Sequence, residues 1–145
     1  PRCAQRGHHE RDTPEGRRGV VTIAMRKRDF EELVREAVGR IPPEFLAIME
    51  NVDVQVRRRP TARQLRSTDL DANEALLGLY EGVPITDRGD YNMVLPDIIT
   101  IFQAPIEEMA GSREEVVEEV RHTVVHEVAH YFGISDAELE EWGVA

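Results

Sequence analysis

The longest regular pattern in this 145-residue chain is a capped helix close to its C-terminal end. Ser112 and Glu115 stand three residues apart, which is the spacing of a capping box at the start of a helix. Gly133 is the residue type that most often ends a helix, because glycine adopts the left-handed conformation without strain. The sequence therefore predicts one helix from about Arg113 to Phe132, a rod about 30 Å long.

The second half of this helix carries His122, His126 and His130 at four-residue spacing. Each residue turns an α-helix by about 100°, so neighbouring histidines lie about 40° apart on one face. The apolar residues of the helix fall on the opposite side, and they are Val117, Val120, Val124, Val128 and Tyr131. The helix is thus expected to pack through its valines and to hold a ligand on its histidine face.

The histidine face contains the pattern H-E-x-x-H-x-x-G-x-x-D, which runs from His126 to Asp136. Two imidazoles one turn apart can each place a nitrogen about 2.0–2.1 Å from one zinc ion. Glu127 lies about 100° further round the helix, where it can reach a water molecule more easily than the metal. Because Gly133 lets the chain leave the helix, Asp136 can return as a third ligand. A fourth position then stays open to water, which is typical of catalytic zinc sites.

The third ligand has competitors in Glu138 and Glu140, and the sequence favours Asp136. Ser135 and Glu138 also have capping-box spacing, so Asp136 is equally suited to the first turn of a short C-terminal helix.

The preceding segments predict an α+β fold, in which a short mixed sheet packs against helices. A helix over 29–38, with Asp29 as its cap, shows apolar residues at helical spacing. A short helix follows over 43–49. Strands are expected at 52–56, at 76–80 with a bulge at Gly78, and at 98–102.

Charge divides the chain into two parts. Residues 1–28 hold eight basic and three acidic residues, whereas residues 29–145 hold ten basic and twenty-five acidic ones. An acidic body repels phosphate backbones, which argues against nucleic acid as the main partner.

We expect a basic, flexible leader over 1–26 and one domain over 27–145. No apolar run can span a membrane, and the single cysteine, Cys3, excludes an internal disulfide, so we expect a cytoplasmic protein without membrane contact.

The order of these elements resembles that of the minimal bacterial zincin-like metallopeptidases. The resemblance covers about residues 26–145 and rests on G-L-Y-E-G at 78–82, P-D-x-I-T-I-F at 96–102 and H-x-x-x-H-E-x-x-H-x-x-G-x-x-D at 122–136. It implies a small zincin-like domain with a shallow cleft. It also implies His126, His130 and Asp136 as ligands of one Zn²⁺ per chain and Glu127 as general base.

The activity that the resemblance implies is hydrolysis of peptide bonds in a peptide or protein substrate. Zinc would activate a water molecule, and Glu127 would take its proton and pass it to the leaving amine. By analogy, the substrate would lie extended along the 98–102 strand as an open sheet edge. His122 is a candidate hydrogen-bond donor in the transition state, although a histidine that supports a ligand or faces solvent is favoured.

The motif departs from those of two larger groups of zinc peptidases. Asp136 stands where metzincins have histidine, and no methionine follows it. Thermolysin-like enzymes take their third ligand from a glutamate further along the chain.

Other functions stay open. The first is a metal-binding regulatory or interaction domain without peptidase activity, in which Glu127 is only a helix residue. The second is a ribosomal-RNA endoribonuclease, whose pattern matches at His122 and His126 but requires histidine where Phe132 stands. The third is a toxin-like or antitoxin-like partner protein, which no specific residue or motif in the sequence supports.

Overall fold

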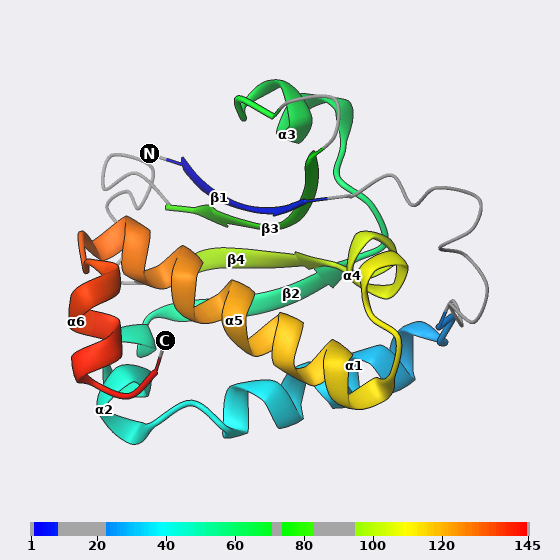
Figure 1. Cartoon of the computed structure of the whole chain (residues 1–145). Helices are drawn as coiled ribbons and strands as arrows, with labels where there is room; N and C mark the ends of the chain where they lie inside the picture. Colours follow the sequence, from blue (N-terminus) through cyan, green and yellow to red (C-terminus); the bar gives the residue numbers. More distant parts are fainter. Residues whose placement is uncertain (1, 9–22, 71–73, 83–94, 145) are drawn as a thin grey trace.

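One mixed sheet organises the protein, whose computed structural model describes residues 2–8, 23–70, 74–82 and 95–144. Its strands follow the spatial order β1-β3-β4-β2. β3 is antiparallel to both β1 and β4, whereas β2 runs parallel to β4. The bounds are Arg2–His8 for β1, Val52–Arg57 for β2, Glu74–Glu81 for β3 and Asp97–Phe102 for β4 (Figure 1).

The helices are short except for two. The long ones are α1, Lys27–Gly39, and α5, Arg113–Phe132. The others are α2 (Pro43–Leu46) with the 3-10 turn η1 (Ala47–Met49), α3 (Ala62–Arg66), α4 (Gln103–Met109) and α6 (Asp136–Glu141). In Figure 1, α5 crosses one face of the sheet and α1 lies beside it.

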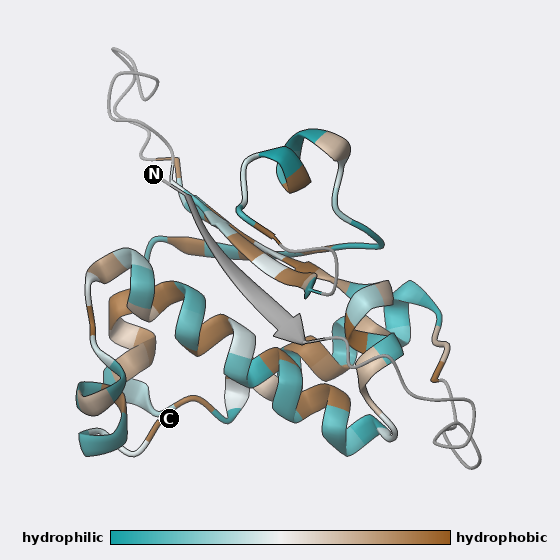
Figure 2. Ribbon diagram, turned by 45° about the horizontal axis from the view of Figure 1, so that its top comes forward, coloured by the Kyte–Doolittle hydropathy of each residue, from teal (hydrophilic) through white to brown (hydrophobic). Residues whose placement is uncertain are grey.

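The core lies between the sheet and the two long helices. The valines predicted to face the core do so, since Val117, Val120, Val124 and Val128 are at most 1% exposed. They pack with Phe30 and its neighbours on α1 and with the inner face of the strands. Figure 2 shows hydrophobic residues along the coloured strands and hydrophilic ones interleaved along the helices. This pattern is that of helices with one buried face.

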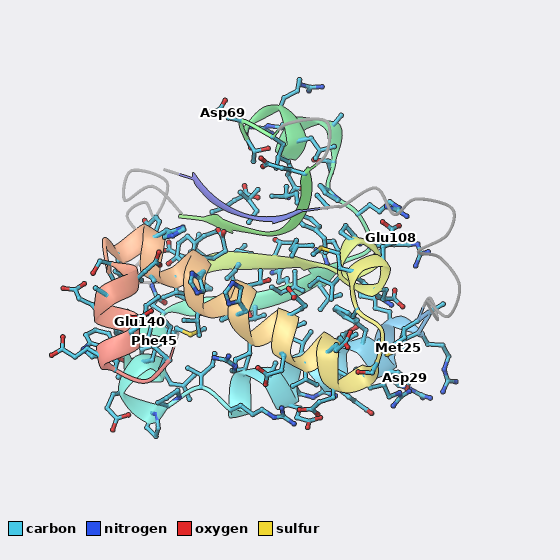
Figure 3. All side chains as sticks on the ribbon, viewed as in Figure 1. Met25, Asp29, Phe45, Asp69, Glu108 and Glu140 are labelled. Carbon is cyan, nitrogen blue, oxygen red and sulfur yellow. The ribbon has the colours of Figure 1, made fainter. Side chains whose placement is uncertain are left out.

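Polar contacts fasten both ends of α1 to its neighbours. Arg40, directly after α1, lies 2.6 Å from Glu114 and 3.2 Å from Glu118 of α5. At the other end of α1, the amide of Met25 donates to Glu107 of α4 over 2.6 Å, and Figure 3 labels Met25 at this end of the molecule. Within the described residues, no helix has the length and apolar character that a membrane crossing requires.

The predicted α+β class is confirmed, and the strands at 52–56, 76–80 and 98–102 are present with slightly wider bounds. The pairing of β1 with β3 skips Leu77, so the bulge lies directly before Gly78. The start of α1 differs from the prediction. Arg26 occupies the cap position, and Asp29 lies in the first turn, 3.1 Å from the Arg26 side chain.

The N-terminal segment also differs from the prediction. The sequence predicts a flexible leader over 1–26, but Arg2–His8 form β1 and pair with β3. A strand held by backbone hydrogen bonds at a sheet edge needs no apolar alternation, which explains why the composition does not reveal it. Residues 9–22 of the predicted leader lie outside the described residues.

The place of β4 corrects a third expectation. The sequence analysis takes the 98–102 strand as an open edge for a substrate, yet β4 lies between β3 and β2. Both of its sides are therefore engaged in the sheet, and it offers no edge for strand addition.

Candidate metal centre

The end of α5 brings the motif residues together. Gly133 has a φ of 72°, which is the left-handed conformation that closes a helix. The amide of Ile134 donates to the Ala129 carbonyl over 2.8 Å, and that of Gly133 donates to the His130 carbonyl over 3.3 Å. This pair of bonds is a Schellman motif, and it turns the chain back toward α5.

The chain then starts α6 at once. Ser135 accepts a hydrogen bond from the Glu138 amide over 3.2 Å, and the Glu138 carboxylate accepts one from the Ser135 amide over 2.9 Å. This confirms the predicted capping box. Asp136, the first residue of α6, is thereby fixed one step after the cap and faces the end of α5.

Three side chains converge there. His126, His130 and Asp136 each offer a ligand atom, and these atoms lie within 4.8 Å of one another. The distance between His126 Nδ1 and Asp136 Oδ1 is 3.7 Å. Two imidazoles and a carboxylate are a donor set suited to zinc, so the three residues can hold a metal ion.

The side chains of His126 and Asp136 differ in their exposure to solvent. Its side chain is 15% exposed, whereas that of Asp136 is 77% exposed. His126 Nε2 is fully buried, and within the described part of the chain it has no hydrogen-bond partner. The His126 nitrogen that faces Asp136 is Nδ1, at 3.7 Å from Asp136 Oδ1.

The electrostatic surroundings keep His126 neutral. Burial lowers its pKa below the ordinary value of 6.5, and the neighbouring His122 lowers it further, while Asp136 opposes the shift. Only the neutral imidazole has a free lone pair for a metal. The site therefore holds His126 in its ligand form at neutral pH.

Glu127 points away from solvent. It is 0% exposed, and its Oε2 accepts a hydrogen bond from the backbone amide of Tyr80 on β3 over 3.2 Å. The carboxylate thus lies between α5 and the sheet, and Glu127 is next in sequence to the candidate ligand His126. The sequence places Glu127 off the ligand face but gives no indication of its contact with Tyr80.

His122 lies against His126. The two ring centroids are 4.0 Å apart with the planes tilted by 34°, whereas the rings of His126 and His130 lie 6.2 Å apart and nearly perpendicular. His122 is outside the group of three converging ligands. Its predicted role as supporting residue or donor stays a prediction.

The competing acids are placed differently from Asp136. Neither Glu138 nor Glu140 belongs to the converging group, among the residues that the structure describes. Glu138 is engaged in the capping box. Asp136 therefore belongs to the converging group and these two glutamates do not, while its role as a metal ligand stays a prediction.

The sequence analysis missed the part that β3 plays. Tyr80 is completely buried, its ring stacks on Tyr131 of α5 at 4.0 Å, and its hydroxyl donates to Asp97 over 2.8 Å. Two glycines flank it at 78 and 82. That symmetrical G-x-Y-x-G pattern is the available signal of a strand in close contact with another element.

Comparison with known proteins identifies the group. The chain is similar to a solved structure, a conserved hypothetical protein from Thermo thermophilus, with a TM-score of 0.47 and 22% identity over 74% of this chain and 94% of that one. The comparison with curated proteins gives no match. The family model described as zincin-like metallopeptidase matches residues 49–144. Because this match spans well over half of the sequence and includes the whole motif, the chain belongs to the zincin-like metallopeptidase family.

Proposed function

We propose that this protein is a zinc-dependent metallopeptidase that hydrolyses peptide bonds, with Glu127 as its general base. The observation that carries the proposal is the convergence of His126 and His130 of α5 with Asp136, the first residue of α6. Glu127 is next in sequence to His126. Family membership supports the same reaction class.

The metal would be held by His126, His130 and Asp136. When bound there, Zn²⁺ supplies Lewis acidity, which polarises a carbonyl group and makes a water molecule more acidic. The His-His-carboxylate donor set fits such an ion.

The protein's own contribution to the reaction lies mainly in Glu127. Its Oε2 accepts the Tyr80 amide, which fixes the orientation of the carboxylate. A carboxylate held this way accepts the proton of the attacking water and returns it to the nitrogen of the leaving amine, so that it ends the cycle unprotonated. His122 is proposed to support His126 by packing on its ring.

Peptides or proteins are the proposed substrates. The acidic body of residues 29–145 argues against nucleic acid. A cytoplasmic location is proposed on the low cysteine content, Cys3 being the single one.

One observation favours a second function. Glu127 is completely buried and bonded to the strand backbone, as a purely structural residue would be. In that case the site belongs to a metal-binding regulatory or interaction domain without turnover.

Metal content and peptide cleavage test the proposal together. We expect one zinc per chain in the parent protein and none in His130→Ala. With a peptide library, we expect Glu127→Gln to keep its zinc and to lose activity by about 10²- to 10⁴-fold. Zinc binding without any cleavage that depends on Glu127 would support the regulatory domain instead, and absence of zinc in the parent would contradict both functions.

A further inference from the structure

We propose that Gly78 and Gly82 are positioning residues for Glu127, because they let the backbone of β3 approach α5 closely enough for the Tyr80 amide to hold the carboxylate. The inference deepens the proposed function and rests on it for the role of Glu127. Neither glycine touches the reacting atoms.

The first observation is a matched series of contacts between strand and helix. Gly78 lies against Thr123, the Tyr80 amide bonds to Glu127, and Gly82 lies against Tyr131. From Gly78 to Gly82, which directly follows β3, every second residue thus meets every fourth residue of α5, in the same chain direction. Two strand residues rise by about 6.6 Å and four helix residues by about 6.0 Å, so the two repeats stay in step over this length.

The second observation is the lack of space at Gly78. A Cβ atom added there would lie 2.6 Å from the Cγ2 of Thr123 and 3.2 Å from the backbone oxygen of Thr100 on β4. Thr123 is itself 0% exposed. Because the sheet blocks one direction, a side chain at position 78 would push α5 away from β3.

Gly82 repeats this arrangement on the other side of Tyr80. An added Cβ would lie 2.5 Å from the hydroxyl oxygen of Tyr131 and 3.1 Å from its Cζ. The Tyr131 ring is held in place by its stack on Tyr80. The two glycines therefore leave room for α5 on both sides of the Tyr80 amide, which binds Glu127.

The hydrogen bond between the Tyr80 amide and Glu127 tolerates little displacement of α5. The Tyr80 amide and Glu127 Oε2 are 3.2 Å apart, at the long end of the range for such hydrogen bonds. A displacement of α5 by a few tenths of an ångström would lengthen this bond beyond the normal range and weaken this hold on the carboxylate. The metal ligands are less affected, because they lie on α5 and the turn to α6, which would move together.

The test compares Gly78→Ala with a matched glycine variant. Gly39→Ala is the control, since an added Cβ at Gly39 meets nothing within 4 Å. Two readouts are used with the full chain: kcat and KM for a cleaved peptide, and the shift and hydrogen exchange of the Tyr80 amide by NMR. We expect Gly78→Ala to bind zinc, to lose about 10- to 100-fold in kcat with little change in KM, and to show faster exchange of the Tyr80 amide. Gly39→Ala is expected to match the parent.

A rescue variant separates positioning from general damage. Thr123→Ala removes the methyl group that Gly78→Ala would strike, so the double variant should recover part of the kcat and of the amide protection. If Gly78→Ala does not fold, Gly82→Ala and this double variant supply the same readouts. A folded Gly78→Ala protein with the kcat and the Tyr80 amide of the parent would overturn the inference.

The two proposals fail in different ways. If the parent protein cleaves no peptide, the proposed function fails. The shift and hydrogen exchange of the Tyr80 amide then test the structural inference without kinetics, and Glu127→Ala serves as the reference for a broken hydrogen bond. If the parent cleaves peptides but Gly78→Ala changes neither readout, only the positioning role is wrong.

Discussion

At the scale of single residues, His126 is the group whose protonation links the metal centre to the stability of the fold. Its imidazole is largely buried, it packs on the His122 ring, and one of its nitrogens has no hydrogen-bond partner within the described residues. Burial lowers its pKa in the folded protein below 6.5, the ordinary value that the unfolded chain retains. The folded and unfolded states therefore bind protons differently as the pH falls.

We predict that the metal-free protein loses stability below about pH 6.5 because of His126. As the pH falls, the unfolded chain takes up the proton first, so the free energy of unfolding decreases until the lower folded pKa is passed. Denaturant unfolding in the presence of a chelator, at pH 7.5 and pH 5, should show a larger loss for the parent than for His126→Gln. Equal losses in the two proteins would mean that His126 is not the residue responsible.

The convergence of His126, His130 and Asp136 could be predicted from the sequence because their geometry is local. His126 and His130 share a helix face by spacing alone, and Gly133 with Ser135 accounts for the return of Asp136. The hold on Glu127 could not be predicted in this way. Tyr80 is 47 residues away in sequence, and the strand and the helix come together only through tertiary packing.

At the scale of elements, the start of α6 determines where Asp136 lies. The two reciprocal hydrogen bonds between Ser135 and Glu138 fix the first turn, of which Asp136 is the first residue. Ser112 has a comparable role at the start of α5, where its side chain accepts a hydrogen bond from the Glu115 amide over 3.1 Å. The two serines therefore form a natural pair for comparison.

We predict that Ser135→Ala weakens metal binding, whereas Ser112→Ala does not. Each substitution removes a helix cap, which costs about 1 kcal/mol of stability. Only the loss of the cap at Ser135 would free the candidate ligand Asp136 to move, because Ser112 lies at the opposite end of α5. Zinc competition with a chromophoric chelator measures the affinity, and thermal unfolding measures the stability. If both variants lose the same affinity, Asp136 does not depend on its cap.

Elements with strong local sequence signals are predicted well, and errors arise where contacts with other parts of the fold determine the structure. The Ser135 capping box at α6, the Ser112 cap of α5 and the bulge beside Gly78 follow from residue types a few positions apart. The capping box predicted at α5 is only half formed, because the Glu115 carboxylate accepts the Gly111 amide and not the Ser112 amide. The prediction starts the first helix too late at Asp29, since the cap position is taken by Arg26, which forms no side-chain cap hydrogen bond.

At the scale of the whole molecule, strand order is the feature that sequence could not supply. The 98–102 strand has the apolar, β-branched composition of a buried strand, and β4 indeed lies inside the sheet. Its expected role as an edge came from analogy and not from its residues. β1 closes the outer side of β3, although its segment carries none of the usual strand pattern.

The candidate metal centre draws on the last two helices, so metal binding there should stabilise the whole fold. His126 and His130 lie on α5, which packs on the sheet, and Asp136 lies on α6, whose Leu139 is completely buried. An ion that binds only the folded state adds about 2.7 kcal/mol at a free concentration of 100 times its dissociation constant. For a domain of this size, that gain corresponds to a rise in Tm on the order of 5–10 °C.

We predict this rise for the parent protein with zinc and its reversal by a chelator. Mg²⁺ at the same concentration should have little effect, because it prefers oxygen ligands in octahedral geometry. His130→Ala removes one of the three ligands from an exposed position, so it should leave the metal-free Tm nearly unchanged while abolishing most of the zinc-induced rise. An equal rise in His130→Ala would locate the stabilising ion elsewhere, for example among the twenty-five acidic residues of 29–145, and would remove the thermodynamic support for a centre built on α5 and α6.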